Sequence, residues 1–244
     1  MKILFIGDSI VKGKLGVSFV DMIAKRFPLA KVTNLGVNGE NLNIISKRLL
    51  LQLKKVNDYD YVVFEGGGGD VFLPHFLEKG KLFEFAHWVQ TKKGMVPNTT
   101  KAAFYSAYKA TIVEAKKLHK GKIILLTYGC LNENLDFKLN AKLEEYNNAI
   151  RQIAEEENVL LADAGARMVD YLKDKPQTDH CLESFWTVTY SDPFITLFKG
   201  GASYLSKKRK LLVTIDGVHL NDRGAGFYYE CIKDVLEKDL NHSN

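Results

Sequence analysis

Two segments far apart in the chain contain the residue types of a serine nucleophile and its base. Ser9 ends the tripeptide Gly-Asp-Ser, directly after the apolar run Ile3–Ile6, and Asp216 and His219 lie three residues apart near the other end. A nucleophilic serine needs a base that takes its proton and an acidic group that orients the base. Asp216 and His219 supply both groups if the fold brings them to Ser9. The simpler interpretation is that Ser9 caps a helix and that the pair lies in an ordinary loop.

Two glycine-bearing segments between them could supply backbone donors to such a site. Residues 34–41 read Asn-Leu-Gly-Val-Asn-Gly-Glu-Asn, and residues 65–70 read Glu-Gly-Gly-Gly-Gly-Asp. Each follows a short apolar run, and glycine there permits a positive φ and a close approach of the backbone. Backbone N–H groups in such turns can bind an oxyanion. A plain tight turn explains each segment equally well.

Short apolar runs alternate with longer helical patterns along the chain. This alternation is typical of a parallel α/β sheet whose right-handed crossovers place helices on both faces, and it predicts a three-layer α/β/α fold. The expected strands are residues 2–6, 32–37, 61–64, 123–128 and 159–162. The expected helices are residues 17–26, 42–55, 99–119, 137–157 and 222–240. Ligands bind at the carboxyl ends of such strands, so we expect Ser9 and the glycine segments to meet there.

Two stretches interrupt this alternation, at about residues 71–98 and 174–210. Both are rich in aromatic residues: the first contains Phe72, Phe76, Phe83, Phe85 and Trp88, and the second contains Phe185, Trp186, Tyr190, Phe194, Phe198 and Tyr204. Loops of this length are uncommon in a compact domain unless they form lids or binding elements. The alternative is that the aromatic residues form a small core beneath an insertion. With no repeat and no linker-like segment, the sequence predicts one domain over residues 1–244.

The order and spacing of these blocks resemble the SGNH (GDSL-type) hydrolase family of esterases, lipases and acyl-processing enzymes. The resemblance implies a flavodoxin-like, five-stranded parallel sheet, with Ser9 as the nucleophile and Asp216 and His219 completing a catalytic triad. It implies that the backbone N–H of Gly39 binds the oxyanion together with that of Ser9, and that no metal or organic cofactor takes part. The implied substrate contacts are Asn38 and Asp70.

One block departs from the family pattern. The third block of the family ends Gly-x-Asn-Asp, where the asparagine side chain donates a hydrogen bond to the oxyanion, but Gly69 stands in the asparagine position here. Loss of one oxyanion donor typically lowers turnover by a factor of about 10²–10³. We therefore expect the missing donor to be replaced by the N–H of Gly69 itself, or by a nearby side-chain amide such as Asn38, Asn41 or Asn43.

The resemblance implies a serine-dependent hydrolase of carboxylic esters that acts through an acyl-enzyme intermediate. The implied substrate is a small molecule, an acylated lipid or carbohydrate. Two alternatives stay open. The acyl group could pass to a sugar hydroxyl instead of water, with the aromatic insertions excluding solvent. Gly69 and the aromatic stretches also suit a weakly active or non-catalytic member of the fold that binds carbohydrate or lipid.

Composition excludes several other classes of protein. The 244 residues are 46% hydrophobic and 26% charged, which is typical of a globular chain. No apolar run approaches the ~20 residues that span a bilayer. The net charge of +5 is spread along the chain, so no nucleic-acid partner is expected, and the basic run at residues 207–210 is interpreted as a solvated loop. Three scattered cysteines and no recognisable secretory signal favour a reducing, cytoplasmic location.

Overall fold

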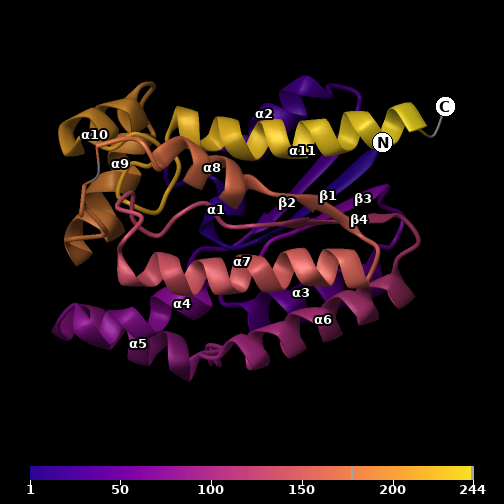
Figure 1. The fold of residues 1–244 in the computed structure, drawn as a ribbon, viewed down its shortest axis with the longest axis horizontal. Coiled ribbons are helices and arrows are strands. Elements are labelled where there is room, and N and C mark those ends of the chain that lie inside the picture. The colour runs from indigo at the N-terminus through magenta and orange to yellow at the C-terminus, as the bar shows by residue number, and fades with distance from the viewer. Residues whose placement is uncertain (177, 243–244) are drawn as a thin grey trace.

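The fold is built on a parallel sheet of five strands in the order β2-β1-β3-β4-β5 (Figure 1). A computed structural model describes residues 1–176 and 178–242 of the chain. The strands are β1 (Lys2–Gly7), β2 (Lys31–Gly36), β3 (Tyr61–Phe64), β4 (Lys122–Leu126) and β5 (Leu160–Ala162). This strand order is that of flavodoxin-like folds. The predicted fold class is therefore confirmed, and every strand lies close to its expected range.

The three central strands form the middle of the hydrophobic core. The side chains of Ile3–Ile6, Val62–Phe64 and Ile124–Leu126 are buried, almost all of them completely. Strands that are covered on both faces have no solvent-facing side, which explains why these segments are continuous apolar runs and do not alternate with polar residues. Ile6 at the end of β1 is paired with Phe64 at the end of β3. The strands therefore end together at one edge of the sheet.

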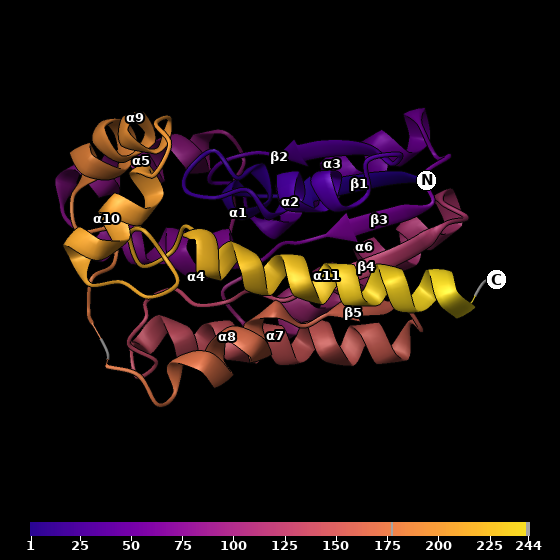
Figure 2. The same cartoon turned by 90° about the horizontal axis from the view of Figure 1, so that it is seen from above.

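Helices cover both faces of the sheet (Figures 1 and 2). One face carries α2 (Phe19–Arg26), α8 (Ala164–Leu172) and α11 (Asp222–His242), and the other carries α3 (Leu42–Lys55), α6 (Lys101–Leu118) and α7 (Lys138–Glu156). Their amphipathic patterns explain this placement, because the buried residues of α3, for example, recur at helical spacing. Of these six helices, α8 alone has no counterpart among the expected helices, although its buried residues Ala164, Met168 and Leu172 recur at helical spacing.

The two insertions are largely helical, and the expectation of long loops there was wrong. The first contains α4 (Gly68–His75), the 3₁₀ turn η1 (Phe76–Glu78) and α5 (Lys81–Lys92), and the second contains the π-helical turn η2 (Thr187–Ser191), α9 (Asp192–Thr196) and α10 (Gly201–Arg209). Both lie at the end of the molecule where the strands end (Figure 2). Phe83 and Phe185 join them, with ring centroids 5.6 Å apart. Contacts of this kind stabilise short helices, and they leave no periodic signal in the sequence.

The aromatic residues of the insertions divide into two groups. Phe72, Phe76 and Phe83 pack ring against ring with centroids 5.2 Å apart, and they form the small core that one interpretation predicted. The second group is exposed by 55–61% and contains Phe85, Trp88, Trp186, Tyr190, Phe194, Phe198 and Tyr204. The insertions therefore combine a packed interior with an aromatic outer surface.

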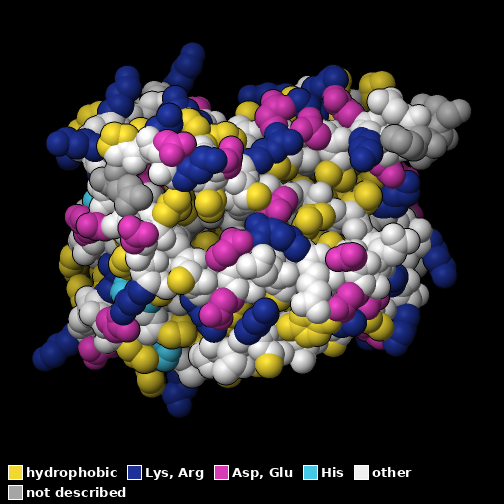
Figure 3. Space-filling view, in the orientation of Figure 1, with side chains coloured by type: hydrophobic (Ala, Val, Ile, Leu, Met, Phe, Trp, Pro, Cys, Tyr) yellow, Lys and Arg dark blue, Asp and Glu magenta, His cyan; other side chains and the backbone are white. Residues whose placement is uncertain are grey.

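The basic run at residues 207–210 is not a loop, because it forms the end of α10. Arg209 within it is paired with the buried Asp192 through two N···O contacts of 2.8 Å each. Figure 3 shows basic and acidic side chains intermixed over one face of the molecule. In the described part of the chain, no helix is both long enough and apolar enough to cross a membrane.

Candidate active site

The fold brings Ser9, His219 and Asp216 into hydrogen-bond contact. The Nε2 atom of His219 lies 3.1 Å from Ser9 Oγ, and the Nδ1 atom of His219 lies 2.7 Å from Asp216 Oδ2. Ser9 and His219 are 210 positions apart in the chain. A nucleophile, a general base and an orienting carboxylate require this arrangement.

Ser9 lies at the start of a one-turn helix, α1 (Ser9–Lys12), directly after β1. Asp8 caps this helix, since its Oδ1 accepts a hydrogen bond of 2.9 Å from the N–H of Ile10. Gly13 ends the turn in the left-handed conformation, with a φ of 65°. The residue that caps the helix is therefore Asp8 and not Ser9, and the Ser9 hydroxyl is directed to His219.

Asp216 holds both the backbone and the ring of His219. Its Oδ1 accepts hydrogen bonds from the N–H groups of Val218 and His219, at 3.0 and 2.8 Å, while its Oδ2 faces the ring. Burial disfavours the protonated ring, but the Asp216 carboxylate outweighs this effect and raises the pKa of His219 above its ordinary value of 6.5. Burial also opposes ionisation of Asp216, yet the charge and hydrogen bonds of His219 lower its pKa. The pair therefore favours imidazolium beside carboxylate.

Two residues that the sequence pattern did not identify hold the segment that precedes Asp216. The buried carboxylate of Glu133 accepts hydrogen bonds from the backbone N–H groups of residues 212–214, at 2.6 to 2.8 Å. Arg209 donates a hydrogen bond of 2.7 Å to the carbonyl oxygen of Ile215. Glu133 is about 80 positions away from its partners, so nothing in its local sequence indicates this contact.

Three backbone N–H groups at the cavity are candidates for binding an oxyanion. Ser9, Gly39 and Gly69 all line the same cavity. Gly39 has a φ of 75°, in the left-handed region that glycine favours. Ser9 is the first residue of α1 and Gly69 is the second residue of α4, and the first N–H groups of a helix have no partner within it.

Only one of the three candidate asparagines reaches the cavity. Asn38 lines it. Asn41 and Asn43 are held elsewhere, because both side-chain amides donate to the carbonyl oxygen of Val96, at 2.6 and 3.1 Å. The expectation that Asn41 or Asn43 replaces the missing donor therefore has no support in this geometry.

The structure does not bring Asp70 to the cavity, although we expected it to contact the substrate. Its side chain is buried, and its carboxylate accepts hydrogen bonds of 2.7 Å each from the N–H groups of Leu42 and Asn98. Asp70 thus joins the start of α3 to the end of the first insertion. Its carboxylate is occupied by these backbone contacts, which make it a structural residue.

A cavity of about 780 Å³ opens beside Ser9. Its lining includes Ser9, Asn38, Gly39, Gly69, Gln90 and His219, together with Asp8, Lys12, Lys14, Tyr128 and Thr189. Its apolar walls come from both insertions and contain Phe72, Leu73, Phe76 and Phe83 from the first and Leu182, Phe185, Val188, Phe194 and Leu197 from the second. Small-molecule sites typically have volumes of roughly 300–1,000 Å³ and apolar walls with a few polar groups, so this cavity has the size and character of a ligand site.

A pair of carboxyl groups is buried next to the serine turn. Glu65 Oε2 accepts a hydrogen bond of 3.0 Å from the N–H of Asp8, and the hydroxyl of Tyr128 donates to Asp8 Oδ2. Burial raises the pKa of Glu65 well above its ordinary value of 4.5, and the neighbouring Asp8 raises it further. Burial also raises the pKa of Asp8, although the hydrogen bond from Tyr128 opposes this change. Folding therefore favours a proton on this pair.

Replacing Glu65 with glutamine is expected to flatten the dependence of stability on pH. In the unfolded chain, Glu65 loses its proton near 4.5, whereas the folded protein holds that proton to a higher pH. The stabilisation is therefore present below pH 4.5 and is lost as the pH rises towards the folded pKa. Between pH 5 and pH 8, the free energy of unfolding of Glu65→Gln should rise relative to that of the wild type by about 1 kcal/mol or more. Urea unfolding at each pH measures this difference. The exposed Glu145→Gln on α7 is the control, and parallel curves for wild type and Glu65→Gln would contradict the assignment.

Within the part of the chain that the structure describes, no three His, Cys, Asp or Glu side chains are grouped as metal ligands would be. Two histidines outside the triad have carboxylate partners of their own. His75 Nδ1 lies 2.9 Å from Glu78, and His180 Nδ1 lies 3.1 Å from Glu183.

Comparison with known protein families identifies the class of this protein. The GDSL-like lipase/acylhydrolase family matches residues 5–226, nearly the whole chain. The chain therefore belongs to this family, which confirms the resemblance seen in the sequence, and it is an SGNH-type ester hydrolase. Comparison with curated protein sequences gives no match.

Solved structures with the same fold include two acetylxylan esterases. Axe2 from Geobacillus stearothermophilus is 20% identical, with a TM-score of 0.62 over 96% of this chain and 92% of that chain. The acetyl xylan esterase AlAXEase is 20% identical, with a TM-score of 0.63 over 96% and 98% of the two chains. LAE5, an alpha/beta hydrolase enzyme from the metagenome of Lake Arreo, Spain, is 18% identical, with a TM-score of 0.62 over 96% and 94%. At these identities the likeness establishes the fold alone.

Proposed function

We propose that this protein is a serine esterase in which Ser9 attacks the ester carbonyl and the acyl chain occupies the apolar cavity. The observation that carries the proposal is the hydrogen-bonded series Ser9, His219 and Asp216, with contacts of 3.1 and 2.7 Å. Solved forms of Axe2 give further support, because three of them are catalytic mutants of a serine, an aspartate and a histidine. That aspartate and histidine are three positions apart, as Asp216 and His219 are.

The proposed reaction has two steps. The Ser9 hydroxyl gives its proton to Nε2 of His219 as Oγ attacks the acyl carbon, and Asp216 stabilises the imidazolium that forms. The N–H groups of Ser9 and Gly39 bind the oxyanion of the tetrahedral intermediate, and His219 then protonates the leaving alcohol. Water, activated by the same imidazole, hydrolyses the acyl-enzyme and restores the serine.

The walls of the cavity favour an acyl chain longer than acetyl. An acetyl group needs little room beyond the serine, whereas the cavity of about 780 Å³ continues between apolar side chains of both insertions. Burial of a methylene group contributes about 0.8 kcal/mol. The four methylenes that separate a hexanoyl from an acetyl group can therefore raise kcat/KM by up to ~10²-fold.

Narrowing the cavity is expected to remove most of this preference for hexanoate over acetate. With p-nitrophenyl esters of two to ten carbons, the wild type should show a kcat/KM at least ~10-fold higher for hexanoate than for acetate. Val188 lines the cavity, and Val188→Trp should remove most of that advantage while acetate hydrolysis continues. Leu29→Trp, at a position that is 96% exposed and outside the cavity, is the matched control. A wild type that prefers acetate would contradict the acyl-chain assignment.

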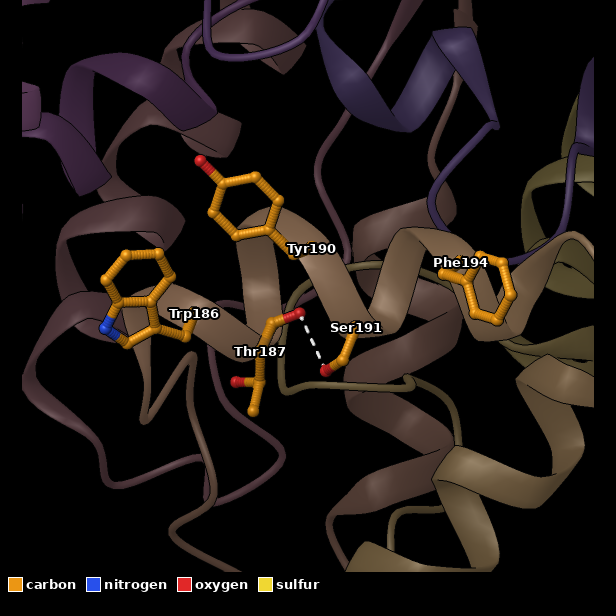
Figure 4. Close-up of a pocket in the computed structure, with 5 residues that line it drawn as sticks. All are labelled: Trp186, Thr187, Tyr190, Ser191 and Phe194. Atoms are coloured by element: carbon orange, nitrogen blue, oxygen red, sulfur yellow. Dashed lines mark hydrogen bonds between the residues drawn. The ribbon is translucent and has the colours of Figure 1, made fainter.

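A second candidate function is removal of acetyl groups from a carbohydrate, and a groove next to the cavity favours it. This groove has a volume of about 620 Å³. Figure 4 shows residues that line it, Trp186, Tyr190 and Phe194 among them. The rings of Trp186 and Tyr190 are stacked with centroids 5.5 Å apart, and flat exposed aromatic faces suit sugar rings. Deacetylation of acetylated xylo-oligosaccharides that is faster than hexanoate hydrolysis, with KM raised by Trp186→Ala but not by Trp88→Ala, would favour this function.

Labelling with a fluorophosphonate tests the serine mechanism itself. The reagent reacts with an activated serine, so peptide mass spectrometry should place the modification on Ser9 and on no other serine. Loss of labelling below the pKa of His219 would agree with a base-activated nucleophile. An unlabelled protein that still hydrolyses esters would contradict the proposal.

A further inference from the structure

The side chain of Gln90, in the last turn of α5, lies on the glycine that borders the proposed oxyanion site. Gln90 lines the cavity together with Ser9, Gly39 and His219. A Cβ placed on Gly39 would lie 3.2 Å from Gln90 Nε2, so the amide lies beside the space that a side chain on Gly39 would fill. An element of the first insertion thus brings a side-chain donor to the cavity that Ser9 and His219 line.

Contacts within the protein do not satisfy all the hydrogen-bonding groups of the Gln90 side-chain amide. Its Oε1 is buried and has no hydrogen-bond partner among the described residues. Its backbone is well fixed, because the carbonyl oxygen of Gln90 accepts hydrogen bonds from Lys93 N and Met95 N, at 3.0 and 3.2 Å. Because Oε1 is an acceptor, an oxyanion cannot satisfy it; its missing partner shows only that no contact with the described residues fixes this end of the amide.

Gly69, where the family has its donor asparagine, has no room for a side chain. A Cβ on Gly69 would lie 2.4 Å from the carbonyl oxygen of Glu40 and 3.1 Å from the α-carbon of Asn41. The segment that carries Gly39 is therefore packed against the backbone of Gly69. A side-chain donor to the oxyanion has to come from another element. Lys12, Lys14, Tyr128 and Thr189 also line the cavity, but Gln90 and Asn38 are the two amides among its described lining residues, and an amide is the donor type that the family uses.

We propose that Gln90 is a catalytic residue that donates an Nε2–H hydrogen bond to the oxyanion, beside the N–H groups of Ser9 and Gly39. No proton is transferred: the bond forms as charge develops on the carbonyl oxygen and is released when the carbonyl is restored. Asn38 is the weaker candidate, because its side chain is exposed and water competes for its donors. The inference rests on the proposed serine mechanism, and it makes the first insertion part of the catalytic apparatus.

The test compares kcat and KM of Gln90→Leu and Gln90→Glu with those of the wild type, with p-nitrophenyl hexanoate and acetate as substrates. Gln90→Leu removes the donor at similar size and should lower kcat by about 10²–10³-fold while KM changes less than about threefold. Gln90→Glu keeps the shape but places an acceptor at the oxyanion, so its kcat should fall at least as far. Gln152→Leu, on the exposed face of α7, is the matched control. Thermal unfolding of each variant shows that a loss of kcat is not a loss of fold.

Two further measurements separate the possible failures. The reaction of Ser9 with a fluorophosphonate forms a similar oxyanion. The rate of labelling should therefore fall together with kcat in Gln90→Leu. A Gln90→Leu protein that keeps its kcat, or loses only substrate affinity, would overturn the role of Gln90 while Ser9 labelling of the wild type still supports the serine mechanism. A large loss of kcat in Asn38→Ala, with none in either Gln90 variant, would assign the donor to Asn38 and overturn the proposal. A wild type without labelling at Ser9 would remove the basis of both proposals.

Discussion

Replacement of Ser9 by alanine is expected to lower kcat for p-nitrophenyl ester hydrolysis by about 10⁵–10⁶-fold. Alanine lacks the hydroxyl that His219 Nε2 contacts at 3.1 Å, so no acyl-enzyme can form. Binding is expected to persist, because the cavity walls and the oxyanion N–H groups are unchanged. Residual hydrolysis by water held in the same site should not exceed ~10³–10⁴ times the uncatalysed rate.

Kinetics at substrate saturation and fluorophosphonate labelling check this prediction together. Ser106→Ala, at an exposed position of α6, is the control and should keep the wild-type kcat. The Ser9→Ala protein should take up no label and should unfold at nearly the wild-type temperature, since the hydroxyl has only one side-chain partner in the site. Activity within tenfold of the wild type would remove Ser9 from the mechanism.

Replacement of Asp216 by asparagine is expected to lower kcat by about 10⁴-fold. Asparagine can keep the acceptor for the N–H groups of Val218 and His219, which Asp216 Oδ1 binds at 3.0 and 2.8 Å. The NH2 group of the asparagine side chain would then face Nδ1 of the His219 ring. Because the NH2 group is a donor, Nδ1 can pair with it only if the ring proton moves to Nε2. In that tautomer His219 cannot accept the Ser9 proton, so the loss follows from the wrong tautomer in an intact fold.

The pH profile separates this effect from simple damage to the site. A raised pKa means that His219 keeps its proton to a higher pH, and only the neutral ring acts as a base. The acid limb of kcat/KM in the wild type should therefore lie above the ordinary histidine pKa of 6.5, with activity lost as the pH falls through it. In Asp216→Asn the limb should move to lower pH, because burial then acts without the opposing carboxylate.

The control for this prediction is Asp170→Asn, which lies on the exposed side of α8 and binds only Lys173. It should change neither kcat nor the position of the acid limb. If the acid limb of kcat/KM in Asp216→Asn lay at the same pH as in the wild type, another group would set the pKa of His219. If this variant kept the wild-type kcat, Asp216 would have no orienting role.

Local sequence features predicted most of the framework. The range 42–55 was expected to be helical and is α3 without a shift, because its apolar residues recur on one face and Asn41 caps it. The central strands were recognisable because burial on both faces removes polar residues from them. The insertions were not recognised as helical, because their short helices depend on ring contacts such as that of Phe83 with Phe185, which join segments about 100 positions apart.

Candidate site residues divided in the same way. Ser9, Asp216 and His219 stand in compact motifs at the ends of predicted elements, and these motifs could be recognised without a structure. Glu133 and Gln90 stand in no such motif, and the sequence assigned no role to Glu65 although it begins the block at residues 65–70; the neighbours of all three in space are distant in the chain. Asp70 was misassigned as a substrate contact for a related reason: its position in a block is visible in the sequence, but the two backbone N–H groups that occupy it are not.

The sequence by itself determined the three-layer α/β/α class of the fold through periodicity, whose physical causes act over a few residues. The order and spacing of its motifs carried the resemblance to a family, and that resemblance implied the flavodoxin-like sheet and the candidate triad. The tertiary structure alone decided that no side chain fits at Gly69, that Gln90 is the amide against Gly39, and that both insertions line one apolar cavity. Such outcomes depend on which distant surfaces pack together within tenths of an ångström, and no local pattern encodes that distance.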